Sequence, residues 1–172
     1  MKTQLIVLPL SLAAIEAQAT VYMTPEQAQS VMFPGETLRP SFRTLDAGQI
    51  QEIRKASGVS PLSRQLKAWR ASGGGWLIVD EVIGKHEFIT FAVALSPAGV
   101  LKSMEILDYR ESYGGQVRDP RWRAQFVGKR AGSPLRSGSE IKTISGATLS
   151  STHVTDGVRR LLATYAIVLA GG

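Results

Sequence analysis

Four segments with strand character follow one another in the middle of this chain, and they constrain its fold more than any other feature. The segments are residues 65–69, 76–82, 87–95 and 100–109. Glycine-rich residues 72–75 separate the first two, and Pro97-Ala98-Gly99 separates the last two. Such turns join strands that run in opposite directions, and residues 87–95 are rich in Phe, Ile, Thr and Val. The pattern predicts an antiparallel meander.

Helix signals lie on both sides of this meander. Thr24-Pro25 with Gln27 predicts a capped helix that runs toward Phe33, and Asp46 with Gln49 predicts a second helix that stops at Gly58. We expect these two helices to pack against the sheet edge. Residues 120–126 predict a short helix, and 153–169 carry apolar residues at three- and four-residue spacing, typical of a long amphipathic helix. The fold class predicted is α+β, with an antiparallel sheet, N-terminal helices and a C-terminal helix.

The first 19 residues differ from the rest. Lys2 precedes an apolar run over residues 5–15, and Ala17-Gln18-Ala19 is a small-x-small cleavage pattern, which together predict a secretory signal peptide. A retained N-terminal anchor is the alternative. Residues 20–172 then form a single domain, with a helical lead-in at 20–60 and a core at 64–172. The predicted location is periplasmic or otherwise extracytoplasmic.

Composition excludes several classes of chemistry. The chain has no cysteine and only two histidines, His86 and His153, so thiol catalysis, covalent haem and a transition-metal centre are not expected. The formal net charge of +6 is consistent with an anionic ligand, an acidic partner, membrane proximity or a solvated basic face. Export and the lack of a binding motif argue against nucleic acid. Any redox chemistry therefore requires a borrowed cofactor.

The segment Ser145-Gly146-Ala147-Thr148-Leu149-Ser150-Ser151 is the strongest functional signal. Its small residues let a bulky partner approach the backbone, and Ser150, Ser151 and Thr152 can cap the helix that follows. The N–H groups and positive dipole end of a helix favour a phosphate, so a phosphate ester on the Thr148 hydroxyl would be well placed. Ordinary loop chemistry before a helix explains the same pattern equally well.

Ser145-Gly146-Ala147-Thr148 resembles the flavinylation motif of FMN-binding domains, which occur in the flavin subunits of sodium-pumping NADH:quinone oxidoreductases and Rnf-type complexes. Residues 109–115 and 122–129 are also similar to blocks of that family, and the resemblance covers roughly residues 76–162. It implies that Thr148 carries FMN through a phosphoester made by an FAD:protein FMN transferase. Lys142 stands where the family motif usually has Asp.

The resemblance also implies a set of cofactor-binding residues around Thr148 and in a glycine-containing loop that lies against the flavin ring. Glu111 and Arg110 are weaker candidates, because an ion pair explains them as well. His86 could have a catalytic role or could form only a local hydrogen bond, and His153 could contact the FMN phosphate or lie on the surface. Residues 113–115 could contact the flavin or form a simple turn. The predicted cofactor-binding residues are Thr148, Ser145, Gly146, Ala147, Leu149, Ser150, Tyr113, Gly114, Gly115 and Glu111.

Two functions from different classes follow. The first is an electron-transfer flavoprotein that relays electrons between a membrane-bound redox partner and another carrier. An enzyme that reduces a small acceptor at the flavin is an alternative with the same cofactor. The second is a flavin-free secreted binding module with the same fold, which Lys142 favours.

Overall fold

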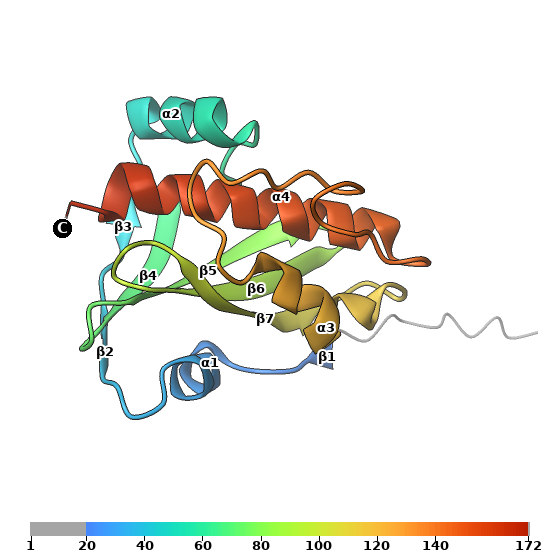
Figure 1. The fold of residues 1–172 in the computed structure, drawn as a ribbon, viewed down its shortest axis with the longest axis horizontal. Helices are drawn as coiled ribbons and strands as arrows, with labels where there is room; N and C mark the ends of the chain where they lie inside the picture. The colour runs from blue at the N-terminus through green and yellow to red at the C-terminus, as the bar shows by residue number, and fades with distance from the viewer. Residues whose placement is uncertain (1–19, 172) are drawn as a thin grey trace, which may run out of the picture.

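A single antiparallel sheet forms the centre of the molecule in the computed structural model, which describes residues 20–171 (Figure 1). The strand order is β1-β7-β6-β5-β4-β2, and β3 pairs with β4 beside this path. The strands are β1 (Thr20–Val21), β2 (Leu38–Pro40), β3 (Arg43–Thr44), β4 (Gln65–Ala71), β5 (Trp76–Ile83), β6 (Phe88–Leu95) and β7 (Leu101–Tyr109). The predicted meander is β4 to β7, and its strands begin and end within two residues of the predicted bounds.

Both predicted capping boxes are present at the N-terminal helices. Thr24 and Gln27 cap α1 (Pro25–Met32), and Asp46 and Gln49 cap α2 (Ala47–Ser57). Gly58 ends α2 with a positive φ of 76°, a conformation that favours glycine. The other helical elements are η1 (Gly115–Arg118), α3 (Pro120–Arg123), η2 (Ala124–Phe126), α4 (Thr148–Thr164) and the π-helical turn η3 (Tyr165–Leu169). The α+β class is confirmed.

The helices cover the two faces of the sheet, and they do not pack against its edge as predicted. Helix α1 brings Ala28 and Met32 onto one face, where Leu77 and Leu107 meet them. Helix α4 covers the opposite face, and α2 lies on α4, outside the sheet (Figure 1). Successive side chains of each strand point to opposite faces of the sheet, and both faces are apolar. A helix with one apolar stripe is buried better on such a face than at an edge.

Helix α4 is held close to the sheet by a glycine and an ion pair. A Cβ on Gly157 would lie 2.6 Å from Val82, so only glycine permits this approach. One turn further, the buried Arg160 guanidinium lies 2.7 Å from the Asp80 carboxylate and also donates to the Glu81 carbonyl oxygen. Burial raises the pKa of Asp80, and Arg160 opposes this rise. These contacts fix where the first turn of α4 lies.

The predicted signal peptide, residues 1–19, lies outside the described residues. Within residues 20–171, no helix is both long enough and apolar enough to cross a bilayer.

Candidate functional site

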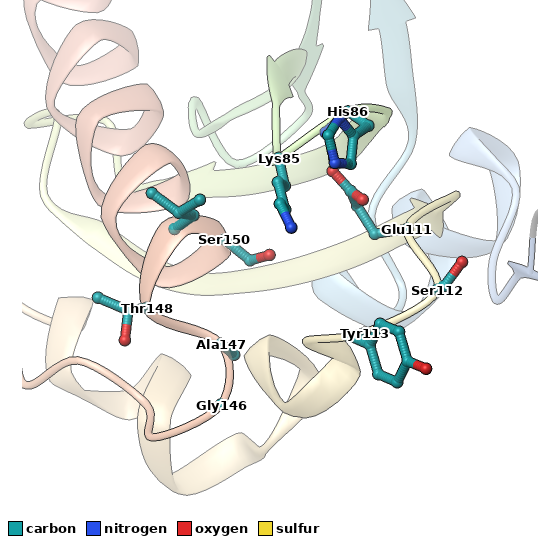
Figure 2. Close-up of a pocket in the computed structure, with 10 residues that line it drawn as sticks. Lys85, His86, Glu111, Ser112, Tyr113, Gly146, Ala147, Thr148 and Ser150 are labelled. Carbon is teal, nitrogen blue, oxygen red and sulfur yellow. The ribbon is translucent and has the colours of Figure 1, made fainter.

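One pocket gathers most of the predicted site residues at the end of the sheet where α4 begins (Figure 2). Its volume is about 530 Å³, within the range of small-molecule sites. Three segments form its walls: the β5–β6 hairpin loop, the loop after β7, and the first turn of α4. The lining residues are Lys85, His86, Glu111, Ser112, Tyr113, Gly146, Ala147, Thr148, Leu149 and Ser150.

The first turn of α4 supplies the polar wall. The helix begins at Thr148, five residues before the predicted start, and Ala147 is its N-cap without a side-chain hydrogen bond. The prediction that Ser150, Ser151 and Thr152 cap the helix is therefore wrong, because these residues lie within its first turns. Among residues 20–171, no acceptor reaches the backbone N–H groups of Thr148, Leu149 and Ser150. Three free donors at a helix N-terminus form a site for a phosphate.

Thr148 is exposed on the rim of this wall, and its hydroxyl is only weakly held. Its Oγ1 lies 3.5 Å from the Ile144 carbonyl oxygen, at the limit of a hydrogen bond. The backbone around it is fixed more firmly, because the Ser151 hydroxyl donates to the Thr148 carbonyl oxygen at 3.0 Å and accepts from Ile144 N–H. The hydroxyl is thus free to react on a rigid support.

The small residues before Thr148 divide into two groups. Gly146, with a φ of 81°, and the buried Ala147 line the pocket. Ser145 is exposed and does not line it. Leu149 is 47% exposed at the rim.

The loop after β7 approaches α4 at Gly114, where φ is 99°. A Cβ here would lie 2.4 Å from the Tyr109 hydroxyl and 2.9 Å from Ser150 Oγ. Gly114 and Gly115 do not line the pocket, although flavin contact was predicted for both; Gly115 opens η1. Gly114 instead permits close packing of two walls. Tyr113 does line the pocket, and its side chain is 86% exposed.

Tyr109 joins the same two walls through its hydroxyl group. The hydroxyl donates to the Tyr113 carbonyl oxygen and lies 2.9 Å from Ser150 Oγ, which donates in return. Burial raises the pKa of Tyr109 above its ordinary value of 10.0, so the hydroxyl keeps the proton that it donates. The loop and the helix start are therefore held as one unit.

Glu111 holds the third wall in place. Its Oε1 accepts hydrogen bonds from the backbone N–H groups of His86 at 2.5 Å and Glu87 at 3.0 Å. A Cβ on Gly84 would lie 2.6 Å from this oxygen, so a larger residue there would displace the Glu111 carboxylate. From the other side, His153 Nδ1 lies 3.0 Å from the Gly84 carbonyl oxygen.

The acidity of Glu111 reflects this role. Burial raises the pKa of Glu111, but the N–H groups of the hairpin loop lower it by more in sum, and it lies below its ordinary value of 4.5. Arg110 does not pair with Glu111; it is exposed and pairs with Asp108 at 2.8 Å.

Comparison with protein families matches this part of the chain to the family described as FMN-binding domain. The match spans residues 84–163, from the first residue of the hairpin loop to the last turn of α4, and so includes every residue that lines the pocket. Residues 84–163 form an FMN-binding domain. No curated protein matches the chain.

The pocket of this FMN-binding domain fits the chemistry of the cofactor. The free N–H groups at the start of α4 suit the phosphate, and the exposed ring of Tyr113 offers a flat surface to an aromatic group.

No cluster of three or more metal-binding side chains occurs among the described residues.

Lys142, which replaces the usual Asp of the family motif, lies outside the pocket of the FMN-binding domain. Its backbone is held by two hydrogen bonds, one from Trp122 Nε1 to its carbonyl oxygen at 2.7 Å and one from its N–H to Gln125. Its side chain is exposed. Lys142 therefore belongs to the surface and not to the lining of the pocket.

Lys85, His86 and Ser112 complete the lining, and the prediction of cofactor-binding residues omitted all three. The glycine before Lys85 was the available signal, because a glycine at the start of a hairpin loop often marks a close approach.

Proposed function

We propose that this FMN-binding domain carries FMN on Thr148 and acts as an electron carrier outside the cytoplasm. The observation that supports it best is the position of Thr148, whose exposed hydroxyl lies at the N-terminus of a 17-residue helix with three free N–H groups beside a cofactor-sized pocket.

The attachment is a phosphoryl transfer from FAD. The Thr148 oxygen forms a new bond to the phosphorus of the FMN half, the diphosphate P–O bond breaks, and AMP leaves with the hydroxyl proton. An FAD:protein FMN transferase supplies the catalysis, and the free N–H groups of α4 would then bind the remaining phosphate charge. FMN supplies electron transfer when it is bound, and the chain orients it and adjusts its potential.

A covalent link suits a protein outside the cytoplasm, because a free flavin would be lost to a large volume, whereas a tether fixes its effective concentration. We infer export from the signal-like residues 1–19, and a membrane-bound redox partner as the electron donor from the family resemblance.

The test is the intact mass of the denatured protein after export from cells that hold an active FMN transferase. We expect an added mass of one FMN less one water, its loss in Thr148→Ala, and its retention in Thr148→Ser, which keeps the hydroxyl. Thr143→Ala is the matched control, since it removes an exposed hydroxyl five residues earlier. Retention of the added mass in Thr148→Ala would refute the assignment.

A flavin-free binding module is the second candidate, and Lys142 is the observation that favours it. Because Lys142 is on the surface and not in the pocket, its effect would be on recognition by the transferase. The variant Lys142→Asp distinguishes the flavin carrier from the flavin-free binding module. If the natural protein stays unmodified and Lys142→Asp becomes modified, the pocket is competent and the natural chain is the flavin-free form.

A further inference from the structure

The hairpin loop of the pocket holds one cation that the proposed function does not use. Lys85 lines the pocket, and Figure 2 shows its side chain extending from the β5–β6 loop into the space beside Ser150. Among residues 20–171, no carboxylate forms an ion pair with Lys85, whereas nearby Arg110 is paired with Asp108.

The other charged group of the lining faces away from a ligand. Glu111 directs its Oε1 at the N–H groups of the hairpin loop, so those donors already satisfy it. His86 and Tyr113 are the remaining lining residues that can titrate. Lys85 is therefore the cation of the lining that extends into the pocket, while the Glu111 carboxylate is turned toward the hairpin loop.

The backbone that carries Lys85 is positioned from two sides. Glu111 accepts the N–H groups that follow Lys85, and His153 contacts the carbonyl oxygen of Gly84 that precedes it. The lysine stem is flexible, but its attachment point is fixed against both the loop after β7 and helix α4. A charge held at a site contributes more to binding than one that must first be ordered.

We propose that Lys85 stabilises the negative charge that FMN gains on reduction, and so raises the reduction potential of the bound flavin. This inference rests on the proposed function, because it requires FMN in this pocket. Two electrons and one proton, taken from an electron donor and from solvent, leave the flavin ring with one extra negative charge. A nearby cation favours that form over the neutral oxidised ring, because the cation attracts the added negative charge.

The experiment is an anaerobic dithionite titration of the flavinylated protein against a reference dye. Lys85→Gln should shift the midpoint potential to more negative values, Lys85→Glu should shift it further, and Lys85→Arg should restore it. Glu111→Gln should shift it the opposite way, because it removes a negative charge and keeps an oxygen for the loop N–H groups. High salt should shrink these shifts.

Lys102→Gln is the matched control, because it removes the same charge at the opposite end of β7 from the pocket. The proposal would be overturned if Lys85→Gln, Lys102→Gln and the natural protein all had the same midpoint reduction potential. Equal shifts in Lys85→Gln and Lys85→Arg would also overturn it, because they indicate a disturbed loop and no electrostatic role.

The mass of each variant separates the two proposals. Added FMN mass with an unmoved potential refutes only the role of Lys85. If no covalent FMN forms on any variant, the proposed attachment fails, and Lys85 is tested with free FMN. The ratio of the Kd for reduced FMN to the Kd for oxidised FMN should then rise in Lys85→Gln, and an unchanged ratio would refute its role.

Discussion

Substitution of Gly114 by Ala tests whether the two walls of the pocket pack as closely as described. The new Cβ would adopt a φ of 99°, and left-handed backbone costs a residue with a Cβ about 1–2 kcal/mol. It would also lie 2.4 Å from the Tyr109 hydroxyl, which must move and lose its partners. A buried hydrogen bond that is lost in this way costs about 1–3 kcal/mol. We expect a total destabilisation of about 2–5 kcal/mol.

Gly128→Ala is the matched control for this prediction. Gly128 has a φ of 83°, and a Cβ there meets nothing within 4 Å, so it isolates the backbone cost. The gain from a stiffer unfolded chain is the same in both variants and cancels.

Urea unfolding followed by tryptophan fluorescence gives the free energy of unfolding of each variant. With a slope of about 2 kcal/mol/M, the extra loss of about 1–3 kcal/mol in Gly114→Ala lowers its midpoint by about 0.5–1.5 M relative to Gly128→Ala. Equal midpoints for the two variants would refute the close packing of Gly114 between Tyr109 and Ser150.

Two further predictions concern other contacts that hold the site. Arg160→Met should destabilise the fold by about 3–5 kcal/mol, because it leaves the Asp80 carboxylate buried without its partner, and a loss below about 1 kcal/mol in urea unfolding would contradict this. Because the pKa of Glu111 in the folded state lies below 4.5, its hydrogen bonds to the hairpin loop should persist at pH 4.5. They should break as the pH falls through that folded-state pKa, and the stability that they contribute should then be lost. The amide proton shift of His86 reports this transition, which should be absent in Glu111→Gln; a midpoint at or above 4.5 would refute the role of Glu111.

The sequence predicted the central sheet well, because alternating apolar strands with glycine and proline turns are local signals. Residues 65–109 carry those signals in full. The short strands β1, β2 and β3 have two or three residues each and were not predicted, since they exist only through pairing with β7 and β4. Pairing of distant segments leaves no local pattern.

The start of α4 shows why small polar residues mislead a prediction. Ser150 to Thr152 are typical caps, but Ser151 uses its hydroxyl within the helix and toward Ile144, and Ala147 takes the N-cap without a side-chain bond. The uncapped start leaves free the N–H groups that the pocket presents.

Most residues that line the pocket were among the predicted cofactor-binding residues, but the contacts that assemble its walls join positions far apart in the sequence. Tyr109 and Ser150 are 41 residues apart, and Glu111 reaches a loop 25 residues earlier. At a strand end, Tyr109 is indistinguishable from an ordinary core residue, and Lys85 from an ordinary loop lysine. Only the fold places their polar groups at one pocket.

The most direct test of the central claim is the location of FMN within the chain. Trypsin cuts after Lys142 and Arg159 and releases residues 143–159, which contain Thr148 and six other hydroxyl residues. Fragmentation of this peptide in a mass spectrometer should place the mass of one FMN less one water on Thr148. An unmodified peptide from a protein exposed to active transferase, or the added mass on another hydroxyl, would contradict the account.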